Sequence, residues 1–369
     1  MQLSVSSPKE NVAQKVLILI SSATTRIKVI ITESLMENKA QEEIVAALNK
    51  VIAETCEQII NPVLREETRK ALVTSSRKWY YQLSTSIRIL NRNLAAKVSK
   101  FESGVYTGSV AALLANIEGI RLSAVRPYLA ESQKGLAVID DYNRKLKVAL
   151  KALAAEPPKI VTVSENEETG RAGYTYTMSL RNRAEMTVRH QANMTDLQNM
   201  QSAGVEYVWI TSHPDASPRC APYQGKLYSL NPDNRTGVHN GIPYTYLQDV
   251  LDLHGGNSIL NGFNCRHRAV AYTDGSQAPT EYTRQKIKRE YAIDQRQRNY
   301  ENNIREMKTE EAILRASGDL ESARTLRLEW RLMTNSYKQF SLKMGRAFYV
   351  WRTVVSDSET YYNENEEDK

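Results

Sequence analysis

Two stretches, WITSHPDASPRCAPYQGKLYSL (residues 209–230) and NGFNCRHRAVAY (residues 261–272), set the centre of this 369-residue chain apart from its flanks. With the glycine-rich segment between them, they hold four of the five histidines and two of the three cysteines. Closely spaced prolines and glycines interrupt helices, because proline lacks the backbone N–H and glycine favours turns. Since long helical patterns lie on both sides, we predict a loop-rich central module between helical regions.

The central module is predicted to be a small mixed α/β unit, because short β-branched runs alternate with turn-forming residues and one helical pattern. The predicted strands are residues 160–163, 205–211, 226–230 and 265–272, and the predicted helices are residues 176–203 and 244–253, with a loop over residues 231–243. Extended backbone places alternate side chains on one face.

The flanking regions show apolar residues at helical spacing. Ser7 and Pro8 form a helix start, and Pro157-Pro158 ends the first helical region, which Asn61-Pro62, Ser103-Gly104 and Pro127 interrupt. A turn at Ser317-Gly318-Asp319 divides the second region into a helical hairpin with a narrow apolar seam. We therefore predict an α+β, predominantly α-helical fold. Its predicted parts are an N-terminal helical domain (1–156), the α/β module (157–278), a C-terminal helical hairpin arm (279–352) and an acidic, flexible tail (353–369).

The composition is that of an ordinary soluble protein, with 41% hydrophobic and 25% charged residues. No apolar run approaches the roughly 20 residues of a membrane span. Residues 1–15 lack the features of a secretory signal, so we expect a cytoplasmic protein. Three widely spaced cysteines do not form a disulfide framework, and Cys56 lies in a helical pattern as an expected core residue.

Charge is unevenly distributed along the chain, which carries a net charge of +7. Residues 1–155 have 22 Lys and Arg against 14 Asp and Glu, and residues 281–352 have 16 against 10. The central residues 156–280 have 10 against 12, and the last seventeen have one lysine against six acids. Basic helices suit a polyanion or an acidic protein, although dispersed charges on solvated helix faces give the same count.

A metal site is the sharpest chemical hypothesis for the central module. His213, Cys220, Cys265 and His267 are the residue types that bind zinc, and four of them can form a closed tetrahedral site. Cys265 and His267 are two residues apart in a predicted strand and leave the same face. His254 is an alternative ligand. A bound ion would stabilise a module that has little core of its own.

Two alternatives use the same residues without a structural metal. In the first, they are hydrogen-bonded side chains that fix the loops. In the second, Cys220 or Cys265 beside His213, His254 or His267 forms a thiol–imidazole nucleophile, or a histidine acts with Arg266 and Lys226 in a nuclease. The sequence has no nucleophile elbow, phosphate loop or paired carboxylates that would assign such roles.

The central motifs resemble those of the phage minor capsid protein type 2 family, which is related to the head-morphogenesis proteins of Mu-like phages. The resemblance covers roughly residues 170–345, and Cys220 and Tyr223 stand where the family more often has histidine and tryptophan. It implies a structural cluster, and the matching residues are His213, Arg219, Gln224, Gly225, Lys226, Asn264 and Arg266.

The resemblance implies a non-enzymatic minor head protein of a tailed bacteriophage. Such a protein is assembled in the host cytoplasm, is present in several copies at the portal vertex of the virion, and assists head assembly and DNA packaging or ejection. Its implied partners are the portal protein and the major capsid protein, with double-stranded DNA as a further candidate. The alternatives are a DNA-binding protein that acts mainly on the genome and a nuclease or toxin-like enzyme carried by the central module.

Overall fold

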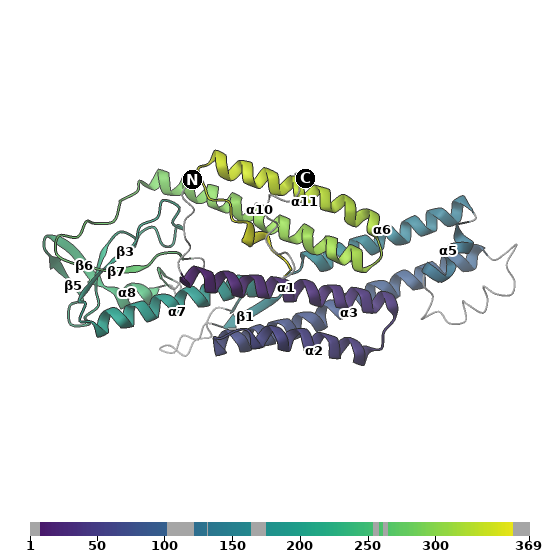
Figure 1. Ribbon diagram of the computed structural model, residues 1–369, viewed down its shortest axis with the longest axis horizontal. Coiled ribbons are helices and arrows are strands. Elements are labelled where there is room, and N and C mark those ends of the chain that lie inside the picture. The colour runs from purple at the N-terminus through teal and green to yellow at the C-terminus, as the bar shows by residue number, and fades with distance from the viewer. Residues whose placement is uncertain are drawn as a thin grey trace, which may run out of the picture.

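The computed structural model describes residues 8–101, 122–130, 132–163, 175–253, 258–260 and 265–356. The molecule is elongated, with a helical body along its length and a small sheet-containing module at one end (Figure 1). The predicted α+β, predominantly helical fold is confirmed. The helices are α1 (Pro8–Glu37), α2 (Gln41–Glu57), α3 (Pro62–Phe101), α5 (Leu122–Leu129), α6 (Gln133–Ala155), α7 (Leu180–Ser202), α8 (Leu247–Leu251), α10 (Arg284–Ala316) and α11 (Leu320–Lys343), with a 3₁₀ turn η2 (Val350–Thr353).

Helix α1 is the centre of the helical body and packs against α2, α3, α7 and α10. Leu17, Ile20, Ile27 and Ile31 recur at helical spacing and are buried, so this stripe of α1 faces the core. Trp79 of α3 is fully buried in the same cluster. Apolar burial along this stripe therefore organises the body.

The C-terminal helical hairpin joins this core. Ile313 and Leu314 of α10 and Ala323 of α11 belong to the same buried cluster as α1, α2 and α3. Helix α10 contacts α1 and α6, whereas α11 packs mainly on α10 (Figure 1). The domain boundaries stay a prediction, but core packing crosses the boundary that the sequence suggests at residue 156.

The module contains a five-stranded sheet with the order β5-β6-β4-β3-β7. Neighbouring strands are antiparallel except for the parallel pair β4–β6. The strands of this sheet are β3 (Tyr207–Ile210), β4 (Leu227–Ser229), β5 (Thr236–His239), β6 (Ile242–Tyr246) and β7 (Ala269–Ala271). A separate core that includes Val208, Ile210 and Tyr228 lies between the sheet and α8. Helix α7 joins the two cores, with Leu180 in the body and Leu197 in the module.

Several local predictions were wrong. The predicted strand 265–272 is present only as β7, so Cys265 and His267 precede it, and the predicted helix 244–253 begins only at Leu247 because residues 244–246 belong to β6. The predicted helix 176–203 begins only at Leu180, because residues before it form β2 (Thr175–Ser179) paired with β1 (Lys159–Val163), and the Ser179 hydroxyl caps α7. The predicted loop 231–243 contains the β5–β6 hairpin. Its Asn240-Gly241 turn has positive φ at both residues, the conformation that Asn-Gly favours. Pro127 lies within α5 and does not end it.

No helix in the described ranges is both long enough and apolar enough to cross a membrane.

Lys28 is an unusual member of the helical core, because its side chain is 1% exposed. Its Nζ donates a hydrogen bond to the Ala154 carbonyl at 2.8 Å and lies 4.8 Å from the centre of the Trp79 ring. Burial lowers the pKa of Lys28 to about 7, and the carboxylates of Glu156 and Glu306 only partly offset it. Below pH 7 the folded protein must therefore hold a buried charge.

The Lys28→Met variant tests this buried amine. Between about pH 7 and the ordinary lysine pKa of 10.5, the unfolded chain keeps the proton that folded Lys28 releases. The free energy of unfolding of the wild type should therefore rise with pH, by on the order of 3 kcal/mol relative to the variant. Urea denaturation of both proteins at pH 6.5, 8 and 9.5 measures it. Parallel pH profiles would contradict a depressed lysine pKa.

Candidate functional site

The loops at one edge of the sheet carry the central motifs. Strand β3 ends at Ile210, and a proline-rich turn leads back to β4, where the Gly225 N–H donates to the Ile210 carbonyl at 3.0 Å. Gly225 has a φ of +69°, a left-handed conformation that favours glycine. This closure sets Cys220 beside the segment that enters β7.

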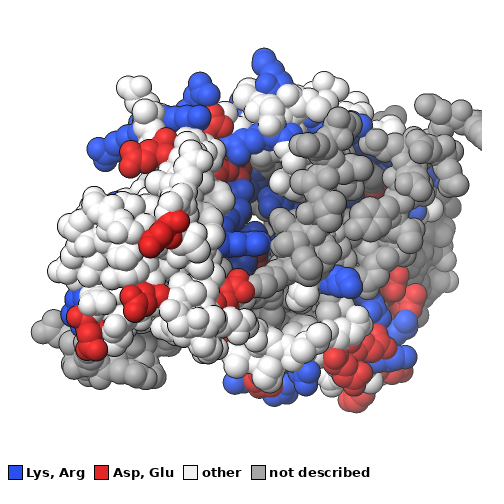
Figure 2. Space-filling model, turned by 60° about the vertical axis from the view of Figure 1, so that its left-hand side comes forward, with Lys and Arg blue, Asp and Glu red and all other residues white. Residues whose placement is uncertain are grey.

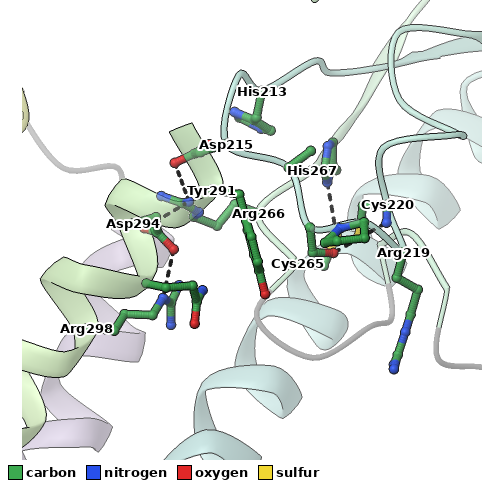
Figure 3. Close-up of a pocket in the computed structure, with 14 residues that line it drawn as sticks. His213, Asp215, Arg219, Cys220, Cys265, Arg266, His267, Tyr291, Asp294 and Arg298 are labelled. Carbon is green, nitrogen blue, oxygen red and sulfur yellow. Dashed lines mark hydrogen bonds and ion pairs between the residues drawn. The ribbon is translucent and has the colours of Figure 1, made fainter. Parts of the chain in front are cut away.

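Three of the four predicted metal ligands meet in this place, and we name them the thiol–imidazole cluster: Cys220, Cys265 and His267. Their candidate ligand atoms all lie within 4.8 Å of one another, and all three residues are buried. Cys265 Sγ is 3.3 Å from His267 Nδ1 and accepts a hydrogen bond from the Leu260 N–H at 3.2 Å. Figure 3 shows the three side chains converging from two separate segments.

Gln224 orients the imidazole of the cluster. Its Oε1 accepts from the backbone N–H of His213 at 2.8 Å and lies 2.8 Å from His267 Nε2. A carbonyl oxygen can only accept, so His267 donates from Nε2. In the neutral ring this hydrogen bond makes Nδ1 an acceptor, and Nδ1 faces Cys265 Sγ.

His213 lies next to the cluster but does not join it. Its ring packs edge-on against the His267 ring, with the ring centroids 4.8 Å apart, and its Nε2 is 3.3 Å from Thr211 Oγ1. Burial, with further contributions from His267 and Arg266, lowers the pKa of His213 to about 4. His213 is therefore neutral at pH 7 and supports the His267 ring by packing.

The pKa values of the two buried thiols are shifted in opposite directions. The hydrogen bond from Cys265 lowers the pKa of the Cys220 thiol, and the same bond raises the pKa of Cys265. One thiolate is therefore already favoured within the cluster. A thiolate beside an unprotonated imidazole nitrogen is both a metal-ligand set and the arrangement of a thiol–imidazole nucleophile.

A buried ion-pair network attaches the cluster to the helical hairpin, and it comprises Asp215, Arg266, Asp294, Arg298 and Arg346. Arg266 bonds Asp215 at 2.6 Å and Asp294 of α10 at 3.3 Å. Arg346, which follows α11, also bonds Asp215 at 3.0 Å, and Arg298 bonds Asp294 at 2.9 Å. Burial alone would raise the pKa of Asp215, but Arg266 and Arg346 outweigh it and lower that pKa.

Two cavities border the cluster. One, of about 360 Å³, lies between the proline-rich turn and α10, and its wall includes Cys220, Arg219, Tyr291 and Arg298 (Figure 3). The other, of about 280 Å³, lies against α1 and α7. His213, Cys265, Arg266 and His267 line both cavities. The cluster is therefore buried from bulk solvent but has space beside it.

The other predicted site residues are not part of the thiol–imidazole cluster. Arg219 lies exposed at the cavity rim and points away from the cysteines (Figure 3). Lys226 is exposed, and its carbonyl accepts from the Ile210 N–H within the sheet. Asn264 and His254 lie outside the described residues.

Sequence reasoning missed the acidic partners and one amide. Asp215 stands in the quoted motif, but its role depends on Arg346, which is distant in the chain. Asn193 of α7 donates to the carbonyls of Leu260 and His267 at 3.1 and 3.3 Å, and so fixes the segment that carries the cluster. No local pattern on α7 or α10 marks Asn193 or Asp294.

Asp215→Asn tests the ion-pair network. The change removes the buried carboxylate and leaves Arg266 and Arg346 undercompensated, so the free energy of unfolding should fall by about 3 kcal/mol. Asp249→Asn is the control, since Asp249 pairs with Arg235 on the exposed surface and its loss should change stability by less than about 1 kcal/mol. Urea denaturation measures both variants. An equal loss in the free energy of unfolding in both variants would show that the network does not stabilise the module.

Comparison with known proteins agrees with these observations. The family model described as phage minor capsid protein 2 matches residues 36–341, a span that includes α2, the whole module and most of the helical hairpin. No curated protein and no solved structure matches the chain. Because the match covers most of its length, the chain belongs to the phage minor capsid protein 2 family and is a structural protein of a phage capsid.

Proposed function

We propose that the protein is a minor structural component of the portal vertex of a tailed-phage head, where it assists head assembly and DNA packaging or ejection. The observation that carries this proposal is the family match across both the body and the module. The architecture supports it, because the module is fixed to the body by buried ion pairs and the chain forms an elongated unit. Its partners would be the portal protein and the major capsid protein.

The outward face of α11 is the contact surface that we propose for these partners. The opposite face of α11 packs on α10 through Ala323 and Tyr337, which are buried. Leu328, Leu332 and Leu342 are 62%, 67% and 58% exposed on α11. Exposed leucines on one helix favour a protein partner, because burying them in an interface removes apolar surface from water.

Replacing Leu328 and Leu332 together by glutamine tests this assignment in phage particles. Glutamine keeps helix propensity but removes the apolar contact, so the variant should fold normally and enter heads in strongly reduced amounts. Quantitative peptide mass spectrometry of purified empty and full heads measures incorporation. Val148→Gln is the control, because Val148 is a 67% exposed residue on α6.

The wild-type protein should occur at a few copies in both empty and full heads. Normal incorporation of the double variant would reject α11 as the contact surface. Complete absence of the wild type from heads would reject the proposed function, and its loss only from heads that have released DNA would identify an ejected protein.

DNA contact is the second candidate function, and two observations favour it. Lys and Arg side chains gather in a recess beside the module (Figure 2). Arg189 lines the smaller cavity, and its Nη1 is buried without a hydrogen-bond partner among the described residues, although its Nη2 pairs with Glu185 at 2.5 Å. Against it, Arg266 and Arg298 are already paired with Asp215 and Asp294. Basic charge in the recess is therefore partly neutralised.

Salt dependence tests this second candidate. If phosphate contacts drive binding, the affinity of the full chain for a random duplex should fall at least tenfold between about 50 and 200 mM salt. Fluorescence anisotropy measures the change. Binding that is absent at low salt, or that salt does not alter, would reject a direct role on the genome.

A further inference from the structure

We infer that the thiol–imidazole cluster is a zinc-class metal site with Cys220 Sγ, Cys265 Sγ and His267 Nδ1 as its protein ligands. Two thiolates and one imidazole form a soft donor set that selects zinc over magnesium or calcium. Zinc–sulfur and zinc–nitrogen bonds of about 2.3 and 2.0 Å place tetrahedral ligand atoms roughly 3.5–3.8 Å apart. The 3.3 Å between Cys265 Sγ and His267 Nδ1, and the 4.8 Å limit for the whole set, agree with such a site after small movements.

The hydrogen bonds around the cluster prepare each ligand for a metal. Gln224 Oε1 accepts a hydrogen bond from Nε2 of His267 and so directs Nδ1 at the thiols. An acceptor behind a metal-binding histidine is the usual means of fixing its tautomer and ring orientation. Gln224 is itself held by the His213 N–H.

The sulfur ligands are also positioned by groups outside the set. The Leu260 N–H donates to Cys265 Sγ at 3.2 Å, which fixes the position of this sulfur. Asn193 of α7 binds the carbonyls of Leu260 and His267, so a helix of the body fixes both ends of this segment. Metal binding would displace the remaining thiol protons and join the proline-rich turn to the segment before β7.

The fourth coordination position faces the larger cavity, and we assign it to a solvent molecule. That cavity is lined by all three ligand residues. His213 also borders it, but its ring packs on His267, and His213 is outside the set of mutually close ligand atoms. The site therefore differs from the four-residue site expected from sequence by having three protein ligands.

Cobalt titration of the full-length chain tests the site. Reduced, chelator-treated protein should bind one equivalent of Co²⁺ with thiolate-to-cobalt charge-transfer absorption and the intense visible bands of tetrahedral cobalt, and Zn²⁺ should abolish both. Wild-type protein that shows no charge-transfer absorption would overturn the proposal. This result does not depend on whether any variant folds.

Matched variants assign the ligands. Cys220→Ser and His267→Gln should each weaken Co²⁺ binding by at least tenfold, with Cys220→Ser also lowering the charge-transfer intensity. Cys56→Ser is the control, because Cys56 is equally buried but lies in the helical body. His213→Gln should retain the metal spectrum, and its loss would overturn the assignment of solvent to the fourth position. Equal binding by wild type and Cys220→Ser would overturn the site itself.

Discussion

The alternation of side chains along Cys265-Arg266-His267 is the constraint on which the site depends. Cys265 and His267, which precede β7, are both buried in the module, and Arg266 between them is only partly buried. Arg266 then bonds Asp215 and Asp294, which belong to the module and to α10. This three-residue segment therefore contributes two members of the cluster and attaches the cluster to the helical body.

The same contacts connect the module to the helical body. Helix α7 carries apolar side chains into both cores, and Asn193 on it binds the backbone that holds the cluster. Arg346 ties the end of the hairpin to Asp215 from another direction. These links suit a structural protein of a capsid, whose parts must keep their relative positions under load. The proposed metal would strengthen the loops of the module and would require no catalytic role.

Much of the fold follows from local patterns, but the site follows only partly. Helical spacing predicts α1 and the α10–α11 hairpin, and the two-residue spacing of Cys265 and His267 predicts a shared face. The β5–β6 hairpin was missed although Asn240-Gly241 is a strong turn signal. His213 was predicted as a ligand and lies beside the cluster, because a proline-rich turn has no periodicity that fixes its path. Asp294 and Asn193 acquire roles only through tertiary packing, which no local pattern encodes.

A localised cryo-electron microscopy reconstruction of the portal vertex in mature heads tests the central claim most directly. The proposed function predicts density at this vertex that fits the elongated helical body with its terminal module, in contact with portal or capsid through the outward face of α11. A vertex whose density is fully explained by other proteins, with this chain absent or elsewhere in the particle, would contradict it.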